Sequence, residues 1–106
     1  MHVQLGTLED IESWMALVQQ IRKSLPGLET EELMHAHRQT VLRFMAEKRA
    51  LCVKAGGRVE GVLLLSHAHN MICFLAVAED CRRRGIATAL LGEGLEQLNQ
   101  IGRAHV

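Results

Sequence analysis

An uninterrupted apolar run in the second half of the chain constrains the fold more than any other stretch. Residues 71–77 read Met-Ile-Cys-Phe-Leu-Ala-Val, with no polar residue at alternate positions. Such a run favours a strand buried on both faces, in the middle of a sheet that helices cover on each side. After a turn, helical periodicity predicts a helix from Arg83 or Arg84 to about Asn99, with an apolar stripe of Ile86, Leu90, Leu91, Leu95 and Leu98. The fold must be built around this strand, turn and helix.

Three consecutive arginines, Arg82, Arg83 and Arg84, stand at the expected start of this helix. The first helical turn carries unpaired N–H groups and the positive end of the helix dipole, so cationic side chains are unfavourable there unless an anion binds. Gly85 and Ala87 add little or no side chain, which would let a bulky anion approach the amides. The pattern therefore indicates a pyrophosphate cradle. Spacing alone leaves an alternative open, a solvated charge run in which Gly85 only eases the turn.

The segment 82–87, Arg-Arg-Arg-Gly-Ile-Ala, resembles the acetyl-CoA motif of the GNAT N-acetyltransferase superfamily, Arg/Gln-x-x-Gly-x-Gly/Ala. In that family the motif lies between the fourth strand and the third helix. The match extends to Cys81 before the motif, to residues 88–91 after it and to residues 75–77 upstream. The resemblance covers nearly the whole chain up to about residue 99.

The resemblance implies an α/β fold with a GNAT-like mixed sheet, in the order β-α-α-β-β-β-α, flanked by helices. Periodicity and turn signals predict the same order. The expected elements are a strand at 2–6, a helix from the N-cap Thr7 to about Ser24, a helix from Thr30 or Glu31 to about Lys48, strands at 50–54 and 59–66, the strand at 71–77 and the last helix. Gly56 and Gly57 are expected to turn between the fourth and fifth of these elements with positive φ. The second helix is expected to bury Leu33, Met34, His37, Val41, Phe44 and Met45.

Family members usually continue with a fifth strand, a further helix and two more strands. We therefore expect residues 1–100 to be a partial GNAT domain that lacks these C-terminal strands and helix. The strand at 71–77 would then present a long hydrophobic edge. Residues 101–106, Ile-Gly-Arg-Ala-His-Val, equal the translation of a common sequencing-adapter stretch. We predict that they are a non-native tail, to be left out of fold reasoning.

The resemblance also implies a cosubstrate, acetyl-CoA, and the residues that bind it. Backbone groups that hold the pantetheine arm are assigned to Leu75, Ala76 and Val77. Pyrophosphate contacts are assigned to Arg83, Arg84, Gly85, Ile86 and Ala87, with Arg82 at the first motif position. The segment 24–29 between the first two helices is implied to touch the acceptor, although it equally serves as a simple connection.

Catalytic residues are harder to assign. Many relatives use a tyrosine to protonate the leaving thiolate, and this sequence contains no tyrosine. His67, His69 and Glu79 are candidates for a general base, because imidazole and carboxylate groups can accept a proton near the expected site. No motif fixes any of them, and each is also explained as a turn residue. His67 and His69 lack a third ligand at a defined spacing, so we expect no metal site.

Composition excludes several classes of protein. The chain has 12 basic and 12 acidic residues and only three aromatic ones (two Phe and one Trp), so nucleic-acid binding is not expected. No signal peptide or membrane-spanning run is present, so we expect a cytoplasmic protein without a membrane partner. Three cysteines without Cys-x-x-Cys spacing indicate neither a disulfide framework nor a zinc site. Neighbouring arginines could lower the pKa of Cys81, and the alternative is a partly buried, inert thiol.

These features together predict a fragment of an N-acetyltransferase that transfers acetyl from acetyl-CoA to a primary amine on a small molecule or protein. The fragment itself is expected to bind CoA weakly and to turn over little. The alternative is a non-catalytic GNAT-fold module in regulation or partner binding. Such a module would complete its sheet with a strand from another chain, for example in a homodimer.

Overall fold

The computed structural model describes the backbone of residues 1–104 and the side chains of residues 1–100. Its strands are β1 (Val3–Leu5), β2 (Ala50–Ala55), β3 (Arg58–Ser66) and β4 (Met71–Val77), and its α-helices are α1 (Ile11–Ile21), α2 (Glu31–Ala46) and α3 (Ile86–Ala104). Short 3-10 turns at Leu8–Asp10, Arg22–Ser24 and Glu79–Cys81 flank α1 and precede α3. The predicted order of strands and helices is confirmed. The side chains of the predicted tail, residues 101–106, lie outside the described residues.

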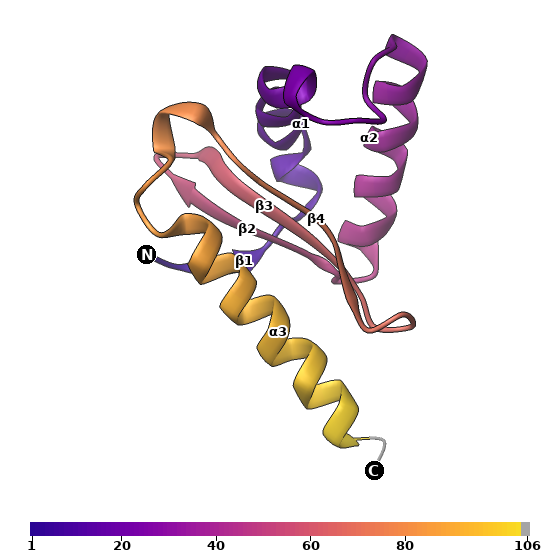
Figure 1. The fold of residues 1–106 in the computed structure, drawn as a ribbon, viewed down its shortest axis with the longest axis vertical. Coiled ribbons are helices and arrows are strands. Elements are labelled where there is room, and N and C mark those ends of the chain that lie inside the picture. Colours follow the sequence, from indigo (N-terminus) through magenta and orange to yellow (C-terminus); the bar gives the residue numbers. More distant parts are fainter. Residues whose placement is uncertain (105–106) are drawn as a thin grey trace.

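The strands form one sheet in the order β1-β2-β3-β4, and every described pair is antiparallel. Helices α1 and α2 pack on one face and α3 packs on the other (Figure 1). Successive strand residues face opposite sides of a sheet. Leu63 accordingly lies against Gly94 of α3, while Phe74, opposite Leu64, lies 4.8 Å from the His37 ring of α2 between ring centroids.

The core lies between the sheet and the helices on both faces. Helix α1 buries residues three or four apart, Ile11, Trp14, Leu17, Val18 and Ile21. Strands β2 and β3 are the most deeply buried, because both have a strand on either side and helices above and below. Gly56 and Gly57 turn between them with φ of 57° and 79°, as predicted. None of the helices within residues 1–104 combines the length and apolar character of a membrane span.

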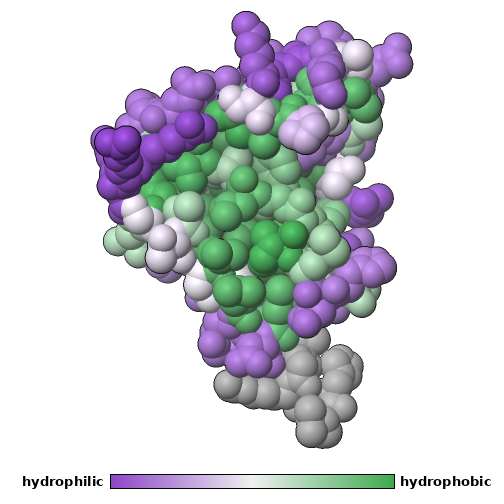
Figure 2. Space-filling model, viewed as in Figure 1, coloured by the Kyte–Doolittle hydropathy of each residue, from purple (hydrophilic) through white to green (hydrophobic). Residues whose placement is uncertain are grey.

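The prediction that residues 71–77 are buried on both faces was wrong. Within β4 only Ala76 is buried, while Met71 is 49% exposed. Strand β4 lies at the edge of the described sheet, which confirms the hydrophobic edge that was expected without a fifth strand. Strand β3 covers one edge of β4, and in the described part of the chain no strand covers the other. Figure 2 shows the result, an apolar surface over the region where Figure 1 draws β4, with polar residues around it.

Two helices also differ from the sequence prediction. Helix α3 begins at Ile86 rather than at the arginines, because Arg83 and Gly85 have φ of 67° and 83°, outside the right-handed helical region. Three leucines predicted on buried stripes are exposed instead: Leu33 of α2 (41%) and Leu91 and Leu95 of α3 (38% and 53%). Helix α3 packs on a sheet that ends at β4. No described strand or helix extends beyond β4 to cover Leu91 and Leu95.

Candidate functional site

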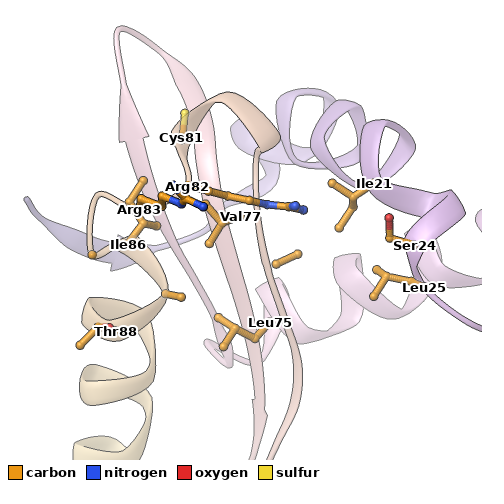
Figure 3. A pocket seen from close by; sticks show the side chains of 13 residues that line it. Ile21, Ser24, Leu25, Leu75, Val77, Cys81, Arg82, Arg83, Ile86 and Thr88 are labelled. Carbon is orange, nitrogen blue, oxygen red and sulfur yellow. The ribbon is translucent and has the colours of Figure 1, made fainter.

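A cavity of about 490 Å³ lies beside the carboxyl end of β4. The end of α1 and the turn after it form one wall, and the loop that leads into α3 forms the opposite wall (Figure 3). Strand β4 lies between the two. The lining residues are Ile21, Ser24, Leu25, Leu75, Ala76, Val77, Cys81, Arg82, Arg83, Gly85, Ile86, Ala87 and Thr88.

The amides at the start of α3 form the polar end of the cavity. The Ala89 N–H donates to the Gly85 carbonyl at 2.9 Å, so the helical ladder begins there. The amides of residues 86–88 precede this first bond and have no acceptor within the helix. Ile86, Ala87 and Thr88 all line the cavity. Together with the helix dipole, these free N–H groups make a site suited to an anion.

Two of the three predicted arginines reach this site. Arg82 and Arg83 line the cavity, whereas Arg84 does not. All three are exposed, and among the described residues none of them forms an ion pair. Their charges are therefore not neutralised by described carboxylates. Gly85, with φ of 83° and no heavy atom near its missing side chain, lets the loop turn into the helix.

The edge of β4 forms the floor of the cavity at Leu75, Ala76 and Val77. Strand β3 pairs with one edge of these residues, and the Ala78 N–H donates to the Glu60 carbonyl at 2.9 Å. On the other edge, no strand within the described ranges uses the backbone groups. An open edge of this kind can accept an extended ligand that carries amide groups, in the manner of an added strand.

The wall opposite the arginines is mostly apolar. Ile21 and Leu25 contribute side chains and Ser24 a hydroxyl group. Arg22 holds the following turn, since its Nε donates to the Leu28 carbonyl at 3.0 Å and its Nη1 lies 2.8 Å from Glu31 Oε1. Of the segment 24–29 that was expected to touch the acceptor, Ser24 and Leu25 line the cavity.

None of the three candidate bases lines the cavity. His67 and His69 lie in the turn between β3 and β4, at the opposite end of β4 from Val77. The exposed Glu79 is closer, because it opens the 3-10 turn that ends at the lining residue Cys81. Their catalytic role stays a prediction.

His37 was expected only as a core residue, and the structure gives it unusual surroundings. It is half-buried against Phe74, and its Nε2 is buried without a hydrogen-bond partner among the described residues. Burial lowers the pKa of His37, which favours the neutral imidazole at neutral pH. The residue lies next to β4 without lining the cavity. The one sequence signal was a polar ring on an apolar helical stripe.

Of the two interpretations of Cys81, the structure favours the buried, inert thiol over activation by neighbouring arginines. Burial raises the pKa of the Cys81 thiol, as does its hydrogen bond to Glu60, with Sγ 3.2 Å from Oε2. The sulfur also lies 3.6 Å from Asp80 Oδ1 and 3.7 Å from Arg58 Nη1 of β3. Cys81 is therefore an inert part of the cavity wall.

Comparison with known proteins identifies the family. The model of the acetyltransferase (GNAT) family matches residues 14–106, which is most of the chain. The chain belongs to the GNAT acetyltransferase family. The matched region includes the whole cavity and the segment 82–87. No curated protein sequence matches the chain.

Solved structures share the fold of this GNAT chain at low sequence identity. A GCN5-related N-acetyltransferase from Kribbella flavida aligns with a TM-score of 0.77 and 17% identity, over 95% of this chain and 27% of that one. PaiA N-acetyltransferase from Thermoplasma acidophilum, in complex with coenzyme A, aligns with a TM-score of 0.72 and 15% identity, over 95% of this chain and 73% of that one. AAC(6')-Iy, in complex with the bisubstrate analogue CoA-S-monomethyl-acetylneamine, aligns with a TM-score of 0.64 and 17% identity, over 98% of this chain and 72% of that one. This GNAT chain therefore spans little more than a quarter of the Kribbella protein.

Proposed function

We propose that the chain is the CoA-binding part of an N-acetyltransferase that moves an acetyl group from acetyl-CoA to a primary amine. One observation carries the proposal. A single cavity joins the free amides of the first α3 turn, Arg82 and Arg83 to the open edge of β4. Family membership and the coenzyme A complexes of two solved structures of the same fold support acyl-CoA as the ligand.

The residues present fit the parts of acetyl-CoA. The diphosphate would bind the amides of residues 86–88, and the Arg82 and Arg83 guanidinium groups would balance its charge. The pantetheine arm carries two amide groups, which suit the open edge of β4. The apolar wall at Ile21 and Leu25 would then exclude water from the acyl end.

In the proposed reaction the amine nitrogen attacks the thioester carbonyl. A C–N bond forms and the C–S bond breaks, so the acceptor ammonium must first lose a proton and the CoA thiolate must gain one. Among the described residues that line the cavity there is no carboxylate or histidine, and the pKa of Cys81 is raised. We therefore propose that the lining residues bind and position acetyl-CoA, and that they do not themselves transfer the protons.

Calorimetric titration with CoA tests the proposal, using two adjacent arginines as a matched pair. Arg83→Gln removes a charge that lines the cavity, and Arg84→Gln removes the same charge beside it. Loss of a charged hydrogen bond predicts about tenfold weaker binding for Arg83→Gln, while Arg84→Gln should stay within about twofold. No binding by the wild type, or equal effects of the two variants, would contradict the proposed cradle.

The absence of a base among the lining residues also favours a second candidate, a non-catalytic GNAT-fold module. Such a module would bind CoA or a partner without turnover. A thiol-release assay with acetyl-CoA and a panel of amines separates the two functions. Robust thiol release by residues 1–106 would exclude the module, and CoA binding without release would favour it.

A further inference from the structure

The loop 82–85 contains the arginines of the site, and it is neither helix nor strand. Arg83 and Gly85 have positive φ, so the loop depends on what holds its two ends. One end is fixed where Ile86 packs against Gly61 of β3. The other end is the 3-10 turn Glu79–Cys81.

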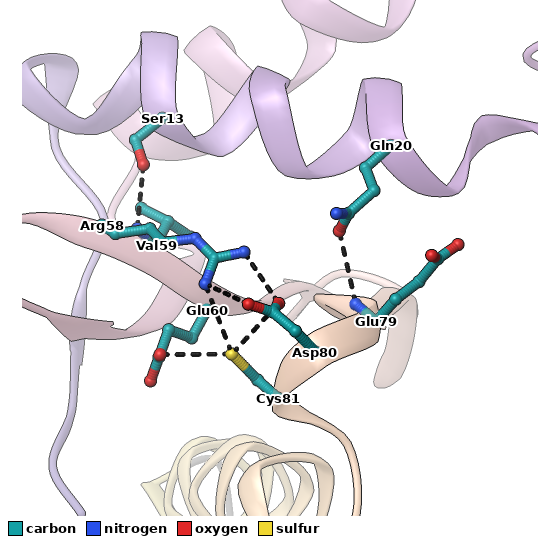
Figure 4. Close-up of polar contacts among 8 residues, drawn as sticks. All are labelled: Ser13, Gln20, Arg58, Val59, Glu60, Glu79, Asp80 and Cys81. Carbon is teal, nitrogen blue, oxygen red and sulfur yellow. Dashed lines mark hydrogen bonds and ion pairs between the residues drawn. The ribbon is translucent and has the colours of Figure 1, made fainter.

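A polar network holds this turn against the sheet and α1 (Figure 4). Arg58 of β3 binds Asp80 through two parallel contacts, with Nη1 2.9 Å from Oδ2 and Nη2 2.8 Å from Oδ1. The Cys81 thiol donates to Glu60 on the same strand at 3.2 Å. The Glu79 N–H donates to Gln20 Oε1 of α1 at 3.3 Å. The turn is thus tied to β3 and to α1, and α1 also contributes the lining residue Ile21.

We propose that Arg58 and Asp80 are positioning residues for the anion site. Their bidentate pair, called here the Arg58–Asp80 clamp, sets the orientation of the turn from which Arg82 and Arg83 enter the cavity. Neither clamp residue lines the cavity, so the clamp acts through the loop. The inference deepens the proposed function, because the ligand is the same diphosphate.

The solvent exposure of Arg58 and Asp80 distinguishes a positioning role from a general contribution to the stability of the fold. The Arg58 and Asp80 side chains are 46% and 63% exposed. Exposed ion pairs add little to global stability, because solvent screens them. Two parallel hydrogen bonds nevertheless restrict the relative orientation of the groups they join. Loss of the clamp should therefore loosen the loop and leave the rest of the fold intact.

The clamp also keeps a negative charge away from the arginines. Asp80 is two residues before Arg82, and its carboxylate is occupied by Arg58. If the clamp acted only through charge, Asp80→Asn would favour anion binding and Arg58→Gln would weaken it. If it acts by positioning, both substitutions weaken binding.

Hydrogen exchange and CoA titration on the full chain test the clamp. The variants are Arg58→Gln, Asp80→Asn and the double substitution. Arg38→Gln is the matched control, because Arg38 forms a comparable exposed pair with Glu12 at 2.9 Å between α1 and α2. Exchange at the Cys81 and Ala89 amides, which donate to the Ala78 and Gly85 carbonyls at 2.9 Å on either side of the loop, needs no ligand, so it tests the clamp even if CoA binding by the wild type fails.

The clamp predicts faster exchange at the Cys81 and Ala89 amides and about tenfold weaker CoA binding in both single variants. The double substitution should match either single one, because both remove the same interaction. Arg38→Gln should change neither measurement. Unchanged exchange at the Cys81 and Ala89 amides, tighter CoA binding by Asp80→Asn, or a loss of protection spread over the whole sheet would each overturn the proposal.

Discussion

Gly61 of β3 and Ile86 of α3 approach so closely that no side chain fits between them. A Cβ atom on Gly61 would lie 2.4 Å from Ile86 Cγ2 and 3.0 Å from Leu90 Cδ1. Gly61 also pairs with Val77, one of the β4 residues in the cavity floor. The first turn of α3 is therefore seated against the sheet by a glycine in a neighbouring strand.

Gly61→Ala should destabilise the protein and displace the start of α3. Overpacking of this kind costs roughly 1–3 kcal/mol, and the shift of the first-turn amides should also weaken CoA binding. Chemical denaturation and calorimetry measure the two effects. Gly92→Ala is the control, because a side chain there meets no heavy atom within 4 Å and should stabilise α3 by about 0.5–1 kcal/mol. Equal effects of the two substitutions would show that the close approach is unimportant.

The order of elements was predictable from sequence because each has a local signal. Alternation, apolar periodicity and the paired glycines at 56 and 57 fix types and turns without reference to distant residues. The segment 82–87 likewise located the anion site, because glycine and arginine at a helix start have a direct physical meaning. Strand neighbours have no such local signal. An apolar run is the same whether a strand is central or at an edge, so the run alone wrongly indicated burial on both faces, and only the expected lack of a fifth strand predicted the edge position.

The contacts of individual side chains also could not be predicted from the sequence. Arg58 and Asp80 are 22 residues apart and no motif links them, so only the fold brings them together. Arg84 belongs to the same run as Arg82 and Arg83, yet the positive φ of Arg83 redirects the chain and leaves Arg84 outside the cavity. Sequence spacing cannot reveal a reversal of that kind.

Gly85→Ala tests the conformation of the loop. A side chain at φ of 83° is strained by about 1–2 kcal/mol, although space around Gly85 is open. Relief of this strain would move the loop, so CoA binding should weaken along with stability. Gly57→Ala imposes similar strain at φ of 79° in the turn between β2 and β3, away from the cavity, and should lower stability alone. If both substitutions weaken CoA binding alike, the effect is global.

The Asp80 carboxyl should titrate in an unusually acidic range. Its hydrogen bonds from Arg58 lower its pKa to about 2 from an ordinary value of 3.8. Because the folded-state pKa is lowered, the resulting stabilisation is present above pH 3.8 and is lost as the pH falls through about 2. Carboxyl NMR should give a clearly higher midpoint, shifted toward 3.8, in Arg58→Gln. A midpoint that stays low in this variant would show that Arg58 is not the cause.

The open edge of β4 should make the chain associate with itself. Met71 begins this strand and is 49% exposed, and an apolar edge with free backbone groups pairs readily with another chain. Met71→Lys should therefore reduce association in sedimentation velocity. Leu8→Lys is the control, because Leu8 is 64% exposed in a 3-10 turn rather than on the edge strand. If Leu8→Lys reduces association equally, added charge rather than the edge explains the effect. CoA should oppose association in the wild type, because Leu75 and Val77 of the same edge line the cavity.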